Sequence, residues 1–399
     1  MKILVLDEEF PYPPNTGKRI RSFNLLMRLA RNHELHYLAY GDRDSESYAA
    51  LAKNGMNPIA VKPQVPAKSG LLFYFRLFLN LFSSRPYIVS SHYSTLFDQA
   101  VGSAVQELNP DIIICEWTPY AVFVEKYKNI KRMVVAHNVE TRIWQRYFEN
   151  EKQPVKRWYI GKQAVKLENF ERAVFKYVDG VTAVSDIDAD QIHSFNHHVP
   201  VEVVENGVDL EYFNAPTGLR DRNKLVFVGT MDWRPNQDCV QYFVKDILPL
   251  IHKERPGIEV IFVGRNAPPH IMALNKIQGV KVTGAVDDVR PYMEEGDVYI
   301  VPLRIGGGTR LKILDALAMR KAVVSTSVGA EGLDLQDGKH LLLADSPERF
   351  AARVLKLLDD PKLAESLGEA GRCQVEEKYG WDKLAGKLEK FISELVEGK

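Results

Sequence analysis

Residues 298–319 read VYIVPLRIGGGTRLKILDALAM, an apolar run followed by three glycines and an amphipathic segment. The run 298–303 is typical of a buried strand, and the segment after the glycines is typical of a helix that continues to about Met319. A strand, a glycine turn and a helix in this order form the repeating unit of parallel α/β sheets. Ligands of such sheets bind beyond the carboxyl ends of the strands, which is where the glycines fall.

The helix after the glycines begins with two cations. Arg310 and Lys312 stand in its first turn, where the helix dipole makes each cation unfavourable by about 0.3–1 kcal/mol unless an anion is bound. Glycines let a ligand approach the backbone, and the free N–H groups of a helix start favour anions. We therefore predict that Gly307, Gly308, Thr309, Arg310 and Lys312 hold a diphosphate. A flexible loop with two solvated side chains is the alternative.

Strand and helix patterns alternate along the whole chain, which predicts an α/β protein. Strands are expected at 3–6, 112–115, 133–136, 181–184 and 201–204, and again, from Lys224 on, at 225–228, 259–263, 280–283, 298–303 and 322–326. Helices are expected at 18–31, 346–360, 361–378 and 381–396. Because 399 residues exceed the size of one ordinary core, two domains are expected.

The domain boundary is predicted at residues 213–218, where Pro216 and Gly218 interrupt both periodicities. We assign residues 1–215 to an N-terminal domain and residues 216–378 to a C-terminal domain. Residues 379–399 form a C-terminal helix with one apolar face, which we expect to pack back toward the N-terminal domain.

Composition narrows the classes of function. The 52 basic and 52 acidic residues cancel, which argues against nucleic-acid binding. Cys115, Cys239 and Cys373 show neither a CxxC pair nor metal-ligand spacing, and so predict free thiols in a reducing cytoplasm and no metal site. The apolar run at the N-terminus is too short for a signal peptide, so a cytoplasmic location is expected.

Residues 70–82 are unusually apolar and aromatic but too short to span a membrane. One interpretation is an interfacial helix at the inner face of the membrane, which would suit a lipid-linked acceptor. The other interpretation is burial in the N-terminal domain.

Several motifs occur in a specific order along the chain: ENGVD at 205–209, FVGTMD at 227–232, VGR at 263–265, GGGTRLKILD at 306–315 and STSVGAEGL at 325–333. Together they resemble glycosyltransferase family 4, and more closely a bacterial branch associated with exopolysaccharide and PEP-CTERM systems. The resemblance implies the GT-B fold, two Rossmann-like parallel-sheet domains facing across a cleft. It also implies a retaining, metal-independent transfer without a cofactor, with the donor mostly on the C-terminal domain and the acceptor mostly on the N-terminal one.

The family often carries two glutamates separated by seven residues, one near the sugar and one on the ribose. The matching positions here are Gly307 and Asp315. Asp315 can accept hydrogen bonds from ribose hydroxyls, whereas Gly307 supplies no carboxylate. A polar position on an exposed helix face is the alternative for Asp315.

The resemblance suggests five further residues. Gly17 ends the loop after the first strand and would face the donor, and His137 follows a strand and would contact the transferred sugar as a hydrogen-bonding group. Gly229 closes a strand, and Arg234 after it would meet the diphosphate. Glu331 would contact donor hydroxyls. Each has a structural alternative: a plain turn, a structural histidine, a helix start or a loop carboxylate.

The sequence thus predicts a hexosyl-type glycosyltransferase of class EC 2.4. It would use a nucleoside diphosphate sugar as co-substrate and a sugar or lipid-linked sugar as acceptor, in the synthesis of a surface polysaccharide or glycolipid. A nucleotide-sugar epimerase or hydrolase on the same fold is one alternative, although it would need cleft carboxylates. A non-catalytic protein that binds nucleotide-sugars is the other.

Overall fold

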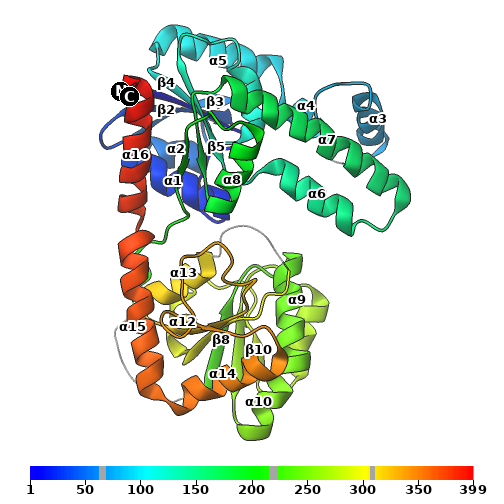
Figure 1. The fold of residues 1–399 in the computed structure, drawn as a ribbon, viewed down its shortest axis with the longest axis vertical. Coiled ribbons are helices and arrows are strands. Elements are labelled where there is room, and N and C mark those ends of the chain that lie inside the picture. Colours follow the sequence, from blue (N-terminus) through cyan, green and yellow to red (C-terminus); the bar gives the residue numbers. More distant parts are fainter. Residues whose placement is uncertain (63–68, 215–222, 306–310, 399) are drawn as a thin grey trace. The chain divides into compact units, whose positions relative to one another are not determined.

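The computed structural model describes residues 1–62, 69–214, 223–305 and 311–398. The contacts between residues divide the chain into two compact units (Figure 1). Unit 1 comprises Met1–Glu205 and Leu384–Lys399, and unit 2 comprises Asn206–Lys383. The boundaries expected from the sequence lie after residues 215 and 378. Each unit has its own apolar core.

Unit 1 is built on a seven-stranded sheet of order β3-β2-β1-β4-β5-β6-β7. Every pairing in it is parallel. The strands are short and mostly buried, as expected for a parallel sheet covered by helices. They are β1 (Lys2–Asp7), β2 (Glu34–Tyr40), β3 (Met56–Val61), β4 (Ile112–Cys115), β5 (Lys131–Ala136), β6 (Gly180–Ala183) and β7 (Val201–Val203).

The helices of unit 1 lie mostly between successive strands. They are α1 (Gly17–Leu29), α2 (Glu46–Lys53), α3 (Leu71–Asn80), α4 (Tyr87–His92), α5 (Thr95–Leu108), α6 (Glu140–Asn150), α7 (Pro154–Tyr177) and α8 (Asp186–Phe195). A short 3-10 helix spans Thr118–Phe123. Helices α6 and α7 form a hairpin that extends outward beside α3 (Figure 1).

Unit 2 is built on a six-stranded parallel sheet of order β10-β9-β8-β11-β12-β13. Its strands are β8 (Lys224–Val228), β9 (Glu259–Val263), β10 (Val280–Val282), β11 (Val298–Val301), β12 (Ala322–Ser325) and β13 (Leu342–Leu343). Its helices are α9 (Arg234–Tyr242), α10 (Leu248–Glu254), α11 (Pro269–Met272), α12 (Arg290–Glu295), α13 (Leu311–Ala318), α14 (Pro347–Asp359) and α15 (Pro361–Lys378). A π-helical turn, Phe243–Ile247, joins α9 to α10, and a 3-10 helix follows α11 at Ala273–Lys276.

The last helix, α16 (Trp381–Glu397), begins in unit 2, and from Leu384 on it belongs to unit 1. It lies close to β6 at Gly180, where a Cβ atom would come within 2.5 Å of Leu395 Cδ1. Lys387 Nζ also donates a hydrogen bond to the carbonyl oxygen of Val203, on β7. Glycine at position 180 therefore lets the helix pack closely against β6 of the first sheet.

The two parallel-sheet units confirm the predicted fold class. Strands β4 and β9 have the bounds expected from their apolar runs. Strands β2, β3 and β13 were not predicted. In β3 the reason is Pro58, which removes a backbone donor and is tolerated because β3 lies at the sheet edge. In β13 the reason is its length of two residues.

Two expectations about the surface and the thiols can also be compared with the structure. The outer side chains of residues 71–82 are exposed, so the alternative that this segment is buried in the N-terminal domain was wrong. No helix in the described part of the chain is long and apolar enough to cross a membrane. All three cysteines are free thiols, with Cys115 and Cys239 buried and Cys373 exposed.

Candidate functional site

Each sheet has one point at which the strand order reverses. In the first sheet β1 lies between β2 and β4, and in the second β8 lies between β9 and β11. Ligands of open α/β sheets bind outside the carboxyl ends of the strands at such a point. The residues that follow β1 and β4, and those that follow β8 and β11, are therefore the candidates for the site.

In unit 2 the residue after β8 is Gly229, and the side chains beside it come from α9 and α13. A Cβ atom at Gly229 would lie 2.8 Å from Asn236 Nδ2 and 3.1 Å from Lys312 Nζ. Asn236 is buried, donates to the carbonyl oxygen of Thr230 at 2.8 Å, and accepts from Lys312 Nζ at 2.6 Å. Glycine at the strand end therefore allows the ammonium group to reach the point where the strand order reverses.

Lys312 is the second residue of α13, so its charge lies at the start of the helix, as the sequence suggested. Its Nζ atom also lies 4.4 Å from the ring centroid of Phe227, which supplies a cation–π contact. The segment before it falls outside the described residues, and the roles of Gly307, Gly308, Thr309 and Arg310 stay predictions.

Asp315 lies one turn beyond Lys312 on α13 and is partly buried. Burial raises the pKa of Asp315 to about 8, although the charge of Lys312 acts in the opposite direction. An exposed polar position on a helix face, the alternative given for this residue, does not describe it. A carboxyl group that is largely protonated at neutral pH can both donate to and accept from a hydroxyl.

Two further candidates in unit 2 lie at the surface. Arg234 is exposed as the first residue of α9, two residues before Asn236. Glu331 is exposed in the segment that joins β12 to β13. Their predicted contacts with the donor stay predictions.

In unit 1 a charged network joins the end of β1 to the start of α1. The buried carboxylate of Asp7 accepts hydrogen bonds from the Tyr37 hydroxyl and from Lys18 Nζ, both at 2.6 Å. Lys18 also contacts Glu8 at 2.8 Å. Burial by itself would lower the pKa of Lys18, but the charges of Asp7 and Glu8 raise it above its ordinary value. The network therefore holds a cation at the strand end.

Gly17 is the exposed first residue of α1 and follows the N-cap residue Thr16, whose hydroxyl accepts a hydrogen bond from the Arg19 N–H. It therefore lies in the connection between β1 and α1, as expected. Close approach of a donor to Gly17 stays a prediction.

A second network in unit 1 joins the ends of β4 and β5. Glu116 directly follows β4, and its N–H continues the ladder by donating to the carbonyl oxygen of Leu6 at 2.9 Å. Its buried carboxylate accepts from the hydroxyl of Ser22 and lies 3.1 Å from His137 Nε2. His137 directly follows β5, at the strand end that the sequence indicated.

A buried cation lies in the same helix as Ser22. Arg21 donates from Nη1 to the carbonyl oxygen of Glu205 at 2.6 Å. Burial lowers the pKa of Arg21 to about 10, and the charges of Glu116 and Glu205 offset only part of this effect.

His137 was a candidate from the sequence, whereas Asp7 and Glu116 were not. The signal that identified His137 was a polar residue directly after an apolar run, and it applies equally to the other two. Asp7 ends the run 3–6, and Glu116 follows the run 112–115. All three positions could have been found by applying this rule to every predicted strand.

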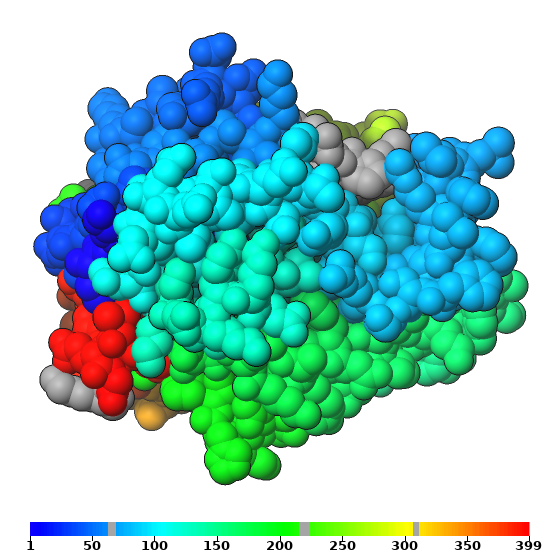
Figure 2. Space-filling view, turned by 90° about the horizontal axis from the view of Figure 1, so that it is seen from above, coloured from blue at the N-terminus to red at the C-terminus, as the bar shows by residue number. Residues whose placement is uncertain are grey.

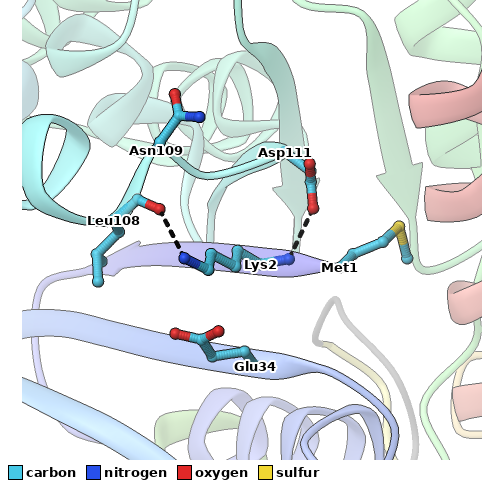
Figure 3. A pocket seen from close by; sticks show the side chains of 6 residues that line it. All are labelled: Met1, Lys2, Glu34, Leu108, Asn109 and Asp111. Carbon is cyan, nitrogen blue, oxygen red and sulfur yellow. Dashed lines mark hydrogen bonds between the residues drawn. The ribbon is translucent and has the colours of Figure 1, made fainter.

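A hollow of about 410 Å³ lies elsewhere in unit 1, beside Lys2, Glu34 and Asp111 (Figure 3). There the N–H of Lys2 donates to Asp111 Oδ2 at 2.8 Å, and Lys2 Nζ donates to the carbonyl oxygen of Leu108 at 3.3 Å. Lys2 and Glu34 begin their strands, so the hollow lies at the amino edge of the sheet. Because ligands bind at the opposite edge, it is not the candidate site.

Comparison with protein families extends these observations. A family model described as "Glycosyltransferase Family 4" matches residues 20–212, and one described as "Glycosyl transferases group 1" matches residues 222–360. The chain is a glycosyltransferase, and the first match supports family 4. The first match begins after β1 and covers β2 to β7, and the second covers β8 to β13.

This glycosyltransferase is similar to two curated proteins at modest identity. It is 22% identical to an uncharacterized 44.6 kDa protein in the cps region of Klebsiella pneumoniae, over 89% of this chain and 90% of the relative. It is 28% identical to a GDP-mannose-dependent alpha-(1-6)-phosphatidylinositol monomannoside mannosyltransferase of Mycobacterium tuberculosis, over 54% of this chain. That second match spans only 61% of the mycobacterial protein.

The glycosyltransferase also shares its fold with solved structures. Sucrose-phosphate synthase from Thermosynechococcus elongatus superimposes with a TM-score of 0.72 over 100% of both chains, at 15% sequence identity. This likeness concerns the arrangement of strands and helices, and supports the GT-B fold.

Proposed function

We propose that this protein transfers a glycosyl unit from a nucleoside diphosphate sugar to a hydroxyl group of an acceptor. The observation that carries the proposal is the position of Lys312. Its ammonium group lies at the start of α13, beside Gly229 and Asn236, where the strand order of the second sheet reverses. A cation, a strand-end glycine and a helix start suit a diphosphate.

In the proposed reaction the bond between the anomeric carbon and the diphosphate oxygen breaks, and the acceptor oxygen bonds to the same carbon. Lys312, Arg310 and the start of α13 stabilise the charge on the departing nucleoside diphosphate. The acceptor oxygen attacks from the face that the diphosphate leaves, so the configuration is retained, and the acceptor proton passes to an oxygen of that leaving group without a metal or cofactor. His137 hydrogen-bonds the sugar, and Asp315 binds the ribose.

The proposed acceptor is a sugar, free or lipid-linked, of a surface polysaccharide or glycolipid. Two relatives support this class, since one lies in a cps region and the other is named for a phosphatidylinositol mannoside and GDP-mannose. The association with exopolysaccharide systems belongs to the same proposal. So does peripheral contact of residues 70–82 with the inner face of the membrane.

The test is a thermal-shift screen of the full chain with UDP, GDP, ADP and dTDP and their sugars. We expect at least one nucleotide to raise the melting temperature. The Lys312→Ala variant should need about tenfold more of that nucleotide for the same rise. Lys276→Ala is the matched control, because Lys276 is an exposed lysine of unit 2. A wild type that no nucleotide stabilises, or a Lys312→Ala variant that responds like wild type, would refute the assignment.

An epimerase or hydrolase on this fold would require a carboxylate able to take a proton from substrate or water. The strand-end carboxylates of unit 1 are instead engaged, Asp7 with Lys18 and Tyr37, and Glu116 with Ser22 and His137. Transfer to an added acceptor, measured against release of free sugar, separates these reactions. A non-catalytic binding protein would give neither product.

A further inference from the structure

Helix α3 presents large apolar side chains to solvent. Seven of them are 50–91% exposed: Leu71, Leu72, Tyr74, Phe75, Phe78, Leu79 and, just beyond the helix, Phe82. Single exposed apolar residues are common on protein surfaces, but a contiguous group of this size indicates a binding surface.

The inward side of α3 is narrow. Only Phe73, Arg76, Leu77 and Asn80 are partly or fully buried, at the spacing of one helix stripe. A surface helix normally carries polar side chains on its opposite face, whereas α3 is apolar there as well. The outward face of α3 therefore lacks the polar side chains that a solvent-exposed helix face normally carries.

The exposed helix is firmly attached to the rest of unit 1. Buried Asn80 accepts a hydrogen bond from Gln163 Nε2 at 2.9 Å, and Gln163 Oε1 accepts one from the Tyr87 N–H at 2.8 Å. Lys166 Nζ donates to the carbonyl oxygen of Asn80 at 2.6 Å. These bonds hold the end of α3 against the middle of α7, so the apolar face is part of a fixed surface.

Helix α7 continues this surface. Val155, Trp158, Lys162 and Val165 are all exposed and follow one another at spacings of three or four residues. They therefore form one stripe along the helix. In Figures 1 and 2 α3 projects beside the α6–α7 hairpin, azure next to green. We call residues 71–82 together with 142–166 the α3–α7 surface.

The charges of the α3–α7 surface are strongly biased, although the whole chain is neutral. Residues 62–97 contain no Asp or Glu at all. Residues 142–166 contain seven Lys or Arg and two Glu, and Glu151 is paired with Lys156 at 2.7 Å. The segments that carry the exposed apolar side chains thus contain more basic than acidic residues.

We propose that the α3–α7 surface binds an anionic lipid bilayer, with the aromatic side chains of α3 at the interface and exposed lysines of the α6–α7 hairpin, among them Lys152 and Lys162, on the headgroups. Amphipathic aromatic residues and long basic side chains suit a headgroup boundary. Protein–protein interfaces are instead depleted in lysine, which disfavours a second copy of the chain as the occupant. The inference rests on the proposed lipid-linked acceptor. It adds α7 as a second helix in contact with the membrane, and anionic lipids as the preferred headgroups.

The experiment is flotation of the full-length protein with vesicles of phosphatidylcholine alone or with 30% phosphatidylglycerol. We expect binding to the anionic vesicles that weakens at high salt. Phe75→Asp/Phe78→Asp should abolish it, and Lys152→Glu/Lys162→Glu should weaken it at least about tenfold. The fluorescence of Trp158, obtained by difference from Trp158→Phe, should shift to the blue on binding.

Ile187→Asp on α8 is the matched control for the apolar change, because Ile187 is 44% exposed in the same unit. Lys128→Glu, at an exposed position, is the control for the charge change. The inference is overturned if the wild type does not bind anionic vesicles, or if Phe75→Asp/Phe78→Asp binds them like the wild type. It is also overturned if the wild type is a dimer in solution that binds no vesicles, and the Phe75→Asp/Phe78→Asp substitutions break that dimer. An unchanged nucleotide response in the same variants shows that such a failure does not concern the donor site.

Discussion

His137 Nε2 lies 3.1 Å from Glu116 Oε2, at the carboxyl ends of the neighbouring strands β5 and β4. Burial alone would raise the pKa of Glu116, but the hydrogen bond and charge of His137, together with Ser22 and Arg21, lower it. Glu116 is therefore an anion that can only accept, so Nε2 carries a proton and Nδ1 is the atom left for a substrate.

This arrangement predicts that Glu116 positions His137. Glu116→Gln removes the charge that fixes the imidazole and should lower kcat by about tenfold to a hundredfold. His137→Ala should have a similar effect, and the double variant should be no worse than His137→Ala alone, because the two residues act through one contact. The measurement is steady-state transfer by all four proteins. Fully additive losses would show that the contact plays no part in the reaction.

A second prediction concerns Gly229. In Gly229→Ala the new methyl group would lie 2.8 Å from Asn236 Nδ2 and 3.1 Å from Lys312 Nζ, so both side chains must move. We expect nucleotide affinity to fall by about tenfold or more, because the cation leaves the strand end.

The matched control for Gly229 is Gly386→Ala on α16, where no atom lies within 4 Å of the added Cβ. Replacing an exposed helical glycine there should stabilise the protein by about 0.5–1 kcal/mol and leave nucleotide binding unchanged. Isothermal titration with the nucleotide found in the screen measures both variants. Equal affinities for wild type and Gly229→Ala would contradict the site.

A third prediction follows from the carboxyl group of Asp315, whose pKa burial raises from 3.8 to about 8. The folded state then holds a proton that the unfolded state releases, so the free energy of unfolding falls as pH rises from about 4 to about 8. Asp315→Asn removes the ionisable group, so this fall in the free energy of unfolding with rising pH should disappear. Its stability advantage over wild type should grow across that range to about 1–3 kcal/mol, less than the full shift would give because the side chain keeps some solvent contact.

Denaturant unfolding of wild type and Asp315→Asn at several pH values between 4 and 9 measures the effect. An advantage that does not change with pH would show that Asp315 ionises normally in the folded protein. If Asp315 also binds the ribose, nucleotide binding near pH 7 should release protons, which calorimetry in buffers of different ionisation enthalpy detects.

A fourth prediction concerns the attachment of α16 to unit 1. A methyl group at Gly180 would lie 2.5 Å from Leu395 Cδ1, so Gly180→Ala should destabilise the protein by about 1–3 kcal/mol through overpacking. Leu395→Ala removes the clashing atoms, and the double variant should recover part of the loss. If thermal unfolding shows no such recovery, the helix does not rest on β6 at this point.

The fold could be predicted well because its signals are local. Apolar runs such as 112–115 and 259–263 mark buried parallel strands wherever they occur, and their alternation with helical patterns defines the two units. Strand β3 escaped prediction because Pro58 contradicts the local rule and is tolerated only at a sheet edge.

The candidate site could be predicted only in part. Lys312, Gly229 and His137 could be selected as candidates because each stands beside a strand or helix boundary that the sequence reveals. Asn236, 76 residues away from Lys312, was not among the predicted site residues. Such a contact depends on which strands are neighbours in the sheet, and no local pattern contains that information.

The sequence by itself determined the alternation of strands and helices, and the cation in the first turn of α13, since both follow from neighbouring residues. Only the tertiary structure decided that Glu116 holds His137, that Asn236 holds Lys312, and that the apolar face of α3 stays in solvent. The physical reason is that a hydrogen bond or the burial of a side chain depends on distant segments being brought together. The α3 segment shows this most clearly, because its composition allowed either burial or exposure and packing against α7 left its outer face exposed.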